Sequence, residues 1–303
     1  MSSQPLLITG IHRSGSTWLG QVVARCPRFG FVWEPLNQET VCYGRFNYRP
    51  NTWYPYISDF DCSRQVDAFQ RLEQFGFNYL NGLRDIKSLR TLLRYGRDAV
   101  NFNRWRCEQR RLLIKDPMAF YSAEWIHRRL NSQVIVLIRN PMAFVASMLR
   151  AGWYMPLVDI VNQVELVEAY PSEILDDIHA FLEGSGDCHS VEACTLGWRY
   201  IHQVIIMLKE KYSNWLFISH EDLVRLPSKM ITEVFNYLRE EPGTKLLSYL
   251  DNSLSSDQGE RGMRRDPAKL LASYEKVLTH EQIKYIRDLC EPELSKLYPG
   301  KSF

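Results

Sequence analysis

The sequence predicts an α/β fold in which a mostly parallel central sheet is flanked by helices in three layers. Short apolar runs alternate with helix-forming stretches along the 303 residues, the order expected of parallel strands joined by right-handed crossovers. The run VIVLI at 134–138 has no polar residue, which indicates a central strand buried on both faces. The first apolar run, at 5–9, leads into Gly10 and then a helical pattern, so the chain opens with a strand-loop-helix unit.

The spacing of apolar residues predicts each element in turn. Strands are expected at 5–9, 29–33, 111–115, 133–138 and 214–219. Helices are expected at 15–25, 62–80, 85–100, 121–131, from Pro141 onward, over most of 152–190, and at 191–211. Proline suits the first turn of a helix, which supports the start at Pro141, and Pro27 ends the first helix. Residues 40–60 are expected to be irregular, and further helices surround a polar loop at 252–268.

Composition indicates an ordinary globular protein with a large core. The chain is 45% hydrophobic and 24% charged, with no internal repeat or linker, so one domain over 1–303 is expected. Helical inserts are expected within it at about 40–110 and 152–195. A net charge of +2 argues against a general polyanion binder and hence against a nucleic-acid partner. Any anion site must be local and built from clustered arginines.

No signal peptide or membrane span is expected. The apolar PLLIT segment leads directly into a glycine loop, and the longest apolar runs are far shorter than the ~20 residues a spanning helix needs. Seven cysteines without a C-x-x-C pair indicate reduced thiols and a cytoplasmic location. Cys188, His189 and Cys194 lack the spacing of a zinc site, so no metal is expected.

The segment GIHRSGST, residues 10–17, has the glycine spacing of a phosphate-binding loop. An ATP-binding loop of this type has lysine directly after the second glycine, but Ser16 follows Gly15 here and the positive charge is at Arg13. Backbone N–H groups at the start of the next helix attract anions, and an arginine fork suits phosphate or sulfate oxygens. Further hydroxyl donors are Ser14, Ser16 and Thr17. A glycine turn with a helix cap is the simpler alternative.

The stretch RSGSTW resembles the loop of sulfotransferases that use 3′-phosphoadenosine 5′-phosphosulfate (PAPS), where [RK]-S-G-[ST]-[ST]-x holds the phosphosulfate. The resemblance implies a P-loop-like fold, a donor that needs no metal, and 3′-phosphoadenosine 5′-phosphate (PAP) as a product. It also implies that Arg13 stabilises the leaving phosphate and that Ser14, Gly15, Ser16 and Thr17 hold the 5′-phosphate. Trp18 matches a tryptophan that stacks on adenine in cytosolic members, although a role in the helix core is an equal alternative.

A second segment, VIVLIRNPMAFVASML, carries Arg139 at a strand end and Ser147 eight residues later. In the same family an Arg…Ser pair at this spacing holds the 3′-phosphate of PAPS. An arginine just past a strand lies where α/β sheets bind ligands. The polar loop with Arg261 and Gly262 resembles the basic loop that closes over that phosphate, although a solvated loop is the alternative.

Transfer of a sulfuryl group to a hydroxyl requires a base that takes the hydroxyl proton. It also requires a positive group that offsets the negative charge on the leaving oxygen. Glu34, in FVWEP at the end of the second strand, is the first candidate base. Its segment resembles the Phe-Glu-Pro segment that follows the loop in carbohydrate sulfotransferases. His12 in the loop is its rival. Lys115 of IKDP matches a Lys-Asp-Pro segment of the carbohydrate enzymes and is expected to stabilise the sulfuryl group or orient the acceptor, while Asp116 is expected to cap or pair.

These features predict transfer of a sulfuryl group from PAPS to a hydroxyl of a carbohydrate or small-molecule metabolite, closest to the carbohydrate branch. N-sulfation, a small-molecule kinase and a non-catalytic nucleotide-binding module are the alternatives. A kinase would need a lysine at position 16 and a magnesium-binding acid, and Ser16 and LIRNP argue against both. The inserts at about 40–110 and 152–195 are expected to bind the acceptor. Their aromatic residues, which suit ring-shaped acceptors or equally a core, are Trp53, Tyr54, Tyr56, Trp105, Trp153 and Tyr154.

Overall fold

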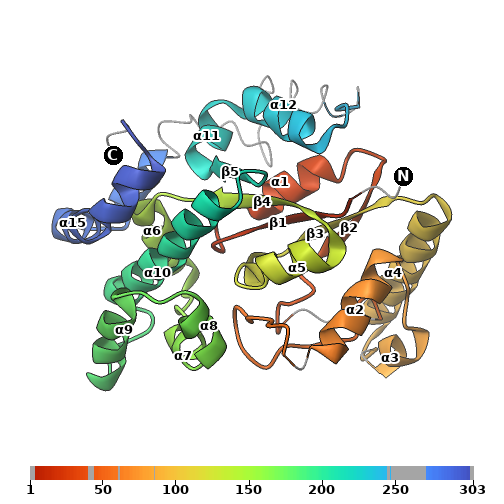
Figure 1. The fold of residues 1–303 in the computed structure, drawn as a ribbon, viewed down its shortest axis with the longest axis horizontal. Helices are drawn as coiled ribbons and strands as arrows, with labels where there is room; N and C mark the ends of the chain where they lie inside the picture. Colours follow the sequence, from red (N-terminus) through yellow and green to blue (C-terminus); the bar gives the residue numbers. More distant parts are fainter. Residues whose placement is uncertain are drawn as a thin grey trace. The chain divides into compact units, whose positions relative to one another are not determined.

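The computed structural model describes residues 4–39, 44–60, 62–84, 86–243, 246 and 271–300 (Figure 1). The described chain divides into two compact units. Unit 1 comprises the described residues up to 12 together with those from 16 to 135. Unit 2 comprises residues 13–15 and the described residues from 136 onward.

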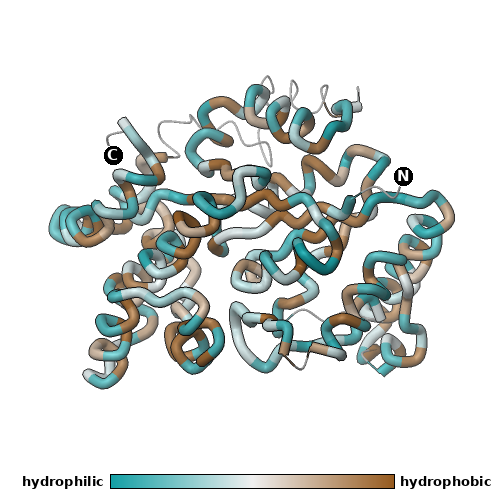
Figure 2. Tube along the Cα trace, viewed as in Figure 1, coloured by the Kyte–Doolittle hydropathy of each residue, from teal (hydrophilic) through white to brown (hydrophobic). Residues whose placement is uncertain are grey.

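Five strands form one sheet in the order β2-β3-β1-β4-β5. They are β1 (Leu6–Gly10), β2 (Phe29–Trp33), β3 (Arg111–Lys115), β4 (Gln133–Ile138) and β5 (Leu216–Ser219). β3 pairs in parallel with β1, where Leu7 lies opposite Ile114, and with β2, where Val32 lies opposite the same residue. Figure 2 shows that the chain of β1, β3 and β4 is largely hydrophobic. The predicted α/β class with a mostly parallel sheet flanked by helices is confirmed.

Helices cover the strands of unit 1. α1 (Ser16–Val23) begins after the glycine loop and packs on β1 and β3, whereas α5 (Ala123–Leu130) packs on β1 from the other side (Figure 1). α2 (Ser63–Glu73) contacts α5, and α4 (Leu89–Cys107) contacts β2 and α3 (Tyr79–Arg84). α4 starts where the Ser88 side chain accepts a hydrogen bond from the Thr91 N–H, completing a capping box.

The chain turns where one helix over 62–80 was expected, and that prediction is wrong. α2 ends at Glu73, and Phe75 adopts a left-handed φ of 49°. The turn buries the Phe75 ring, whose centroid lies 5.8 Å from that of Phe102 and 5.5 Å from that of Trp105. Burial of this aromatic side chain against α4 offsets the cost of the unusual backbone conformation.

Unit 2 is mainly helical. Its elements include α6 (Pro141–Ala151), α7 (Leu157–Val161), α8 (Val164–Ala169), α9 (Ile174–Glu183), α10 (Val191–Lys211), α11 (His220–Arg225), α12 (Pro227–Leu238), the 3₁₀ helix η2 (Ala272–Lys276) and α15 (His280–Leu297). α10 packs against α6, α9 and α15. α6 starts at Pro141 as predicted and stops at Gly152, whose φ of 63° is left-handed. None of the described helices combines the length and apolarity needed to cross a membrane.

Candidate donor and catalytic sites

The glycine loop joins the end of β1 to the start of α1. Gly15 adopts a φ of 89°, which L side chains rarely take, and a Cβ there would lie 2.7 Å from Nδ1 of His220. Both the backbone angle and this close approach therefore require glycine. The path of the loop therefore depends on a backbone geometry that other residue types rarely adopt.

Within unit 2, Arg13, Arg139 and Ser147 come together. Nε of Arg13 donates a hydrogen bond of 3.0 Å to Oγ of Ser147 on α6. Nη1 of Arg139, directly after β4, donates to the carbonyl oxygen of Arg13. The Arg13 guanidinium also lies 5.0 Å from the ring centroid of Trp153. Three residues predicted from separate motifs to bind the donor thus lie together, with two guanidinium groups among them.

Polar groups around this loop lack partners among the described residues. They are Nε of Arg139, Oγ of Ser14 and Nδ1 of His220, all shielded from solvent. Buried polar groups are nearly always hydrogen-bonded, so such a cluster around one loop fits a polar ligand. Because two guanidinium groups are also present, the chemistry of this donor set fits a polyanion.

The charge states at this site follow from burial. Burial lowers the pKa of Arg139 to about 10, opposed mainly by the carboxylate of Glu221, so Arg139 stays charged at neutral pH. Burial, and then the charge of Arg139, lower the pKa of His220 to about 4, against a hydrogen bond with the Ser14 backbone. His220 is therefore neutral at neutral pH, and because a neutral imidazole has one N–H, the ring nitrogen that does not bond the Ser14 backbone is a hydrogen-bond acceptor.

The backbone around Arg139 is held from two sides. Nε1 of Trp198 on α10 donates a 2.8 Å hydrogen bond to the Arg139 carbonyl oxygen. The N–H of Asn140 donates to Oε1 of Glu221 at 3.0 Å, and the Tyr298 hydroxyl donates to Oε2 of the same carboxylate at 2.8 Å. Glu221 and Tyr298 are buried, so these bonds position Arg139 and place a negative charge near it.

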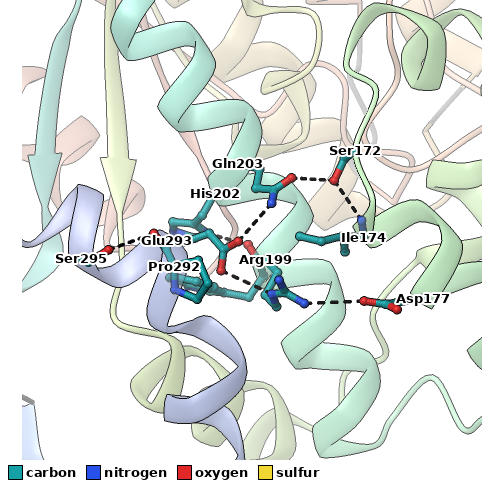
Figure 3. Close-up of polar contacts among 10 residues, drawn as sticks. Ser172, Ile174, Asp177, Arg199, His202, Gln203, Pro292, Glu293 and Ser295 are labelled. Atoms are coloured by element: carbon teal, nitrogen blue, oxygen red, sulfur yellow. Dashed lines mark hydrogen bonds and ion pairs between the residues drawn. The ribbon is translucent and has the colours of Figure 1, made fainter.

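A polar network ties α10, the helix that carries Trp198, to its neighbouring helices (Figure 3). On α10, Nε of Arg199 donates to Oε2 of Glu293 at 3.3 Å, and Nε2 of Gln203 donates to Oε1 at 3.1 Å. Arg199 also pairs with Asp177 on α9 at 3.6 Å, and the Ser172 hydroxyl donates to Oε1 of Gln203 at 2.5 Å. Glu293 lies on α15, so the network links α9, α10 and α15.

His202 on α10 packs directly against Trp198. The two rings are stacked with centroids 3.8 Å apart, and Nδ1 of His202 is hydrogen-bonded to the Trp198 carbonyl oxygen at 2.8 Å. Burial lowers the pKa of His202 to about 3, so the imidazole is neutral at neutral pH. A neutral, stacked imidazole fixes the indole that in turn bonds the Arg139 backbone.

In unit 1, the two other residues predicted to be catalytic form an ion pair. Nζ of Lys115, at the end of β3, donates to Oε1 of Glu34, which follows β2. Nδ2 of Asn37 donates to Oε2 of Glu34 at 2.7 Å. The Lys115 side chain is buried, and its ammonium lies 4.5 Å from the ring centroid of Trp33. The carboxylate of Glu34 is thus held at both oxygens.

His12 is buried and bonded to Tyr54. The backbone N–H of His12 donates a 3.0 Å hydrogen bond to the Tyr54 hydroxyl, and the ring Nδ1 of His12 contacts the same oxygen. Tyr54 is fully buried, so it is part of the core and presents no face to an acceptor. The prediction for Asp116 is confirmed: its side chain caps the 3₁₀ helix η1 (Pro117–Ala119) through the Met118 N–H at 2.9 Å. Burial raises the pKa of Asp116 to about 7.

The other predicted donor-binding residues lie partly outside this geometry. Ser16, Thr17 and Trp18 form the first turn of α1 in unit 1, with Ser16 buried and the other two half-buried. Arg261 and Gly262 lie outside the described residues. Across the described ranges, no group of three or more His, Cys, Asp or Glu side chains is arranged to hold a metal ion.

Sequence reasoning missed several supporting residues. Asn37 follows Glu34 by three positions, and this short spacing was the only available signal. Trp198 and Tyr298 carry no motif, because packing of α10 and the end of α15 brings them to the Arg139 backbone and to Glu221. Glu221 lies in the segment ISHEDL, on α11 directly after β5.

A family model described as the sulfotransferase domain matches residues 3–297. Solved structures similar to the chain include the sulfotransferase domain of the Synechococcus PCC 7002 olefin synthase (18% identity, 94% of each chain, TM-score 0.45). Others are a sulfotransferase from Alicyclobacillus acidocaldarius (13% identity, 98% of this chain and 95% of the other, TM-score 0.46) and mouse sulfotransferase SULT7A1 complexed with PAP (12% identity, 97% and 85%, TM-score 0.44). A search of curated proteins found no match.

Proposed function

Because the chain belongs to the sulfotransferase family, we propose that it transfers a sulfuryl group from PAPS to a hydroxyl of a carbohydrate or small-molecule metabolite. The observation that carries this proposal is the meeting of Arg13, Ser147 and Arg139 beside polar groups that lack partners among the described residues. Ser16 stands where an ATP-binding loop has its lysine, which favours a donor with a sulfated monophosphate over a triphosphate.

The proposed donor roles follow from charge. PAPS supplies an activated sulfuryl group and leaves as PAP. Arg13 neutralises charge that develops on the leaving phosphate, and Ser14 with the N–H groups of residues 15–17 binds the 5′-phosphate. Arg139 binds the 3′-phosphate together with Ser147, and Arg261 with Gly262 is proposed to close over it. Trp18, half-buried on α1, is available to stack on the adenine.

Glu34 is the proposed base. A carboxylate held by Lys115 and Asn37 has a fixed direction, and it takes the proton from the acceptor hydroxyl as the new bond to sulfur forms. Lys115 then offsets negative charge on the transferring group. His12 is the weaker candidate, because its Nδ1 already contacts the buried Tyr54 hydroxyl.

The acceptor is proposed to bind residues of two inserts of a single sulfotransferase domain, at about 40–110 and 152–195. Trp153 and Tyr154 follow α6 and are exposed, and aromatic faces of this kind bind sugar rings. Trp153 also contacts Arg13, so an acceptor on its ring would lie beside the proposed donor site. The Lys-Asp-Pro segment at 115–117 supports placement near the carbohydrate branch, and a cytoplasmic acceptor is the corresponding proposal.

Release of PAP from PAPS in the presence of panels of sugars and small hydroxylated metabolites tests this function. Glu34→Gln is expected to lower kcat by about 10²–10⁴-fold, because it removes the base while keeping the side chain's shape. PAP affinity should change by less than about twofold, since Glu34 does not contact the donor in this proposal. Glu39→Gln, at an exposed position nearby, is the matched control. Full activity of Glu34→Gln would contradict the role of Glu34.

A further inference from the structure

Helices α3 and α4 of unit 1 present large apolar side chains to solvent. Leu80 is 78% exposed, Leu89 71%, and Leu93 and Val100 67% each. We define the apolar stripe as Leu80, Leu83, Leu89, Leu92, Leu93 and Val100, all exposed. α3 and α4 contact each other (Figure 1), so the stripe extends over adjacent helices. Clustered exposure of this kind marks an interaction surface, whereas single exposed leucines do not.

The stripe lies on a side of α4 different from its buried side. Residues 89, 92, 93, 96 and 100 recur at helical spacing and therefore share one side of the helix. The buried residues Asp98, Ala99 and Phe102 fall on another side, where Phe102 packs against the rings of Phe75 and Phe77. α4 thus packs on its own unit through residues other than those of the apolar stripe.

A basic row accompanies the stripe. Its members are Arg84, Lys87, Arg90, Arg94 and Arg104, all exposed. Residues 79–107 contain seven Lys or Arg and two Asp. Of these acids, Asp98 is buried and paired with Arg45 at 3.4 Å and with Arg97 at 3.3 Å. Among the described residues of 79–107, the exposed charges are therefore positive.

From this arrangement we propose that α3 and α4 dock on the surface of an anionic lipid bilayer, with the apolar stripe entering the headgroup boundary and the basic row contacting anionic headgroups. Exposed leucines beside a Lys/Arg row are typical of helices that lie in a membrane interface. Anionic lipid complements the basic row, whereas a second copy of the chain would bring two basic rows together. The stripe and the basic row contain none of the proposed donor-binding residues, and the proposal does not depend on the proposed reaction.

Sedimentation of the full chain with vesicles tests the proposal. Vesicles of phosphatidylcholine with phosphatidylglycerol should bind the protein, and pure phosphatidylcholine vesicles should bind it much more weakly. The variant Leu89→Gln/Leu93→Gln/Val100→Gln is expected to lower the vesicle partition coefficient about tenfold or more, because it removes three apolar side chains that enter the bilayer on binding. Arg90→Gln/Arg94→Gln should also lose about tenfold or more, since each basic residue near an anionic surface contributes about fivefold.

The matched control is Val158→Gln/Val164→Gln, which changes exposed apolar residues of α7 and α8 and should leave partition unchanged. Circular dichroism and the unfolding midpoint confirm that each variant is folded. The proposal is overturned if the wild-type protein ignores anionic vesicles or if the control loses binding equally. It is also overturned if the stripe variant abolishes a dimer in ultracentrifugation, or if the protein binds immobilised polyglutamate but no vesicles, which would indicate a second copy or an acidic protein.

Discussion

At the scale of single residues, the account depends on how Arg139 is positioned. Its backbone carbonyl accepts from Trp198, and the next N–H donates to Glu221, which Tyr298 holds from its other oxygen. Glu221 also opposes the loss of charge that burial imposes on Arg139. Tyr298 therefore acts on the proposed donor site through Glu221 without contacting the donor.

Replacing Tyr298 by phenylalanine should weaken PAP binding. The change removes the hydrogen bond to Oε2 of Glu221. The carboxylate that positions residues 139 and 140 then keeps the bond at Oε1 and loses the one at Oε2. A hydrogen bond to a charged group contributes about 1.5–3 kcal/mol, and a fraction of it transmitted to binding gives a loss of about threefold to tenfold in affinity. Isothermal titration calorimetry with PAP measures it.

Tyr200→Phe is the control for that variant, because it also removes a buried tyrosine hydrogen bond in unit 2, to the Tyr170 carbonyl oxygen at 3.0 Å. Both variants should lose stability, but Tyr200→Phe should bind PAP as the wild type does. An equal loss of affinity in the two variants would reduce Tyr298 to a general stabilising role.

Sequence patterns singled out residues that the structure brings together, but they did not predict how these residues pair. Arg13, Arg139 and Ser147 came from two separate motifs, and nothing in either motif predicted that Ser147 would accept from Arg13. Glu34 and Lys115 were both predicted to be catalytic, but their ion pair depends on β2 and β3 being neighbours. The bond between His12 and Tyr54 was not predicted either, because Tyr54 lies outside the helices and strands and apolar spacing does not determine its position.

At the scale of elements, α10 connects the core of unit 2 to the backbone around Arg139. Trp198, His202, Arg199 and Gln203 are spaced along it so that the indole bonds Arg139 while the polar side chains hold α9 and α15. The buried carboxylate of Glu293 is the centre of that network (Figure 3).

Loss of the Glu293 carboxylate should destabilise the protein strongly. Among the described ion pairs, Glu293→Ala leaves Arg199, which is largely buried, with the Asp177 pair at 3.6 Å. Breaking a buried ion pair from one side costs about 3–5 kcal/mol, although the remaining partner reduces this to about 2–3 kcal/mol. Asp288→Ala on the same helix removes an exposed pair with Lys284 and should cost less than about 1 kcal/mol. Chemical denaturation compares the two, and equal costs would show that the Figure 3 network contributes little.

Buried His202 should make stability fall with decreasing pH. Its pKa is about 3 in the folded chain and near 6.5 when unfolded, so the unfolded state binds more protons below pH 6.5. The lost free energy of unfolding approaches about 1.4 kcal/mol for each pH unit below that value. His220, whose pKa is also lowered, adds to this dependence in the same direction.

Urea denaturation between about pH 7.5 and 5.5 measures this dependence. His202→Gln removes one titrating group and should flatten the curve by the contribution of one histidine. A slope unchanged by His202→Gln would mean that His202 does not titrate on unfolding in this range.

The strands were predicted more accurately than the helix boundaries. β2, β3 and β4 have the expected bounds, because each is a short apolar run between turn or charged residues, and α10 has the expected bounds as well. The break after α2 was missed, since a left-handed phenylalanine has no local signal and only the packing of Phe75 on α4 explains it. Tertiary contacts decided that boundary.

At the scale of the whole molecule, each unit holds part of the proposed chemistry. Unit 2 contains the pair of arginines with Ser147, and unit 1 contains Glu34 with Lys115. The family match covers residues 3–297 and therefore spans both units. Sulfuryl transfer requires the donor-binding residues as well as the base. Binding of the donor precedes the transfer step and can be measured by itself.

The most direct test of the central claim is thermal unfolding with PAP, ADP and magnesium-ATP at one common concentration, near 100 times the dissociation constant of PAP. A ligand at that concentration stabilises the folded protein by about 2.7 kcal/mol, which gives a clear shift in midpoint. PAP should raise the midpoint without metal at concentrations where ADP does not, and Arg139→Ala should abolish this preference. A shift by magnesium-ATP instead, or an equal response to ADP and PAP, would contradict a donor site built for a 3′-phosphorylated nucleotide.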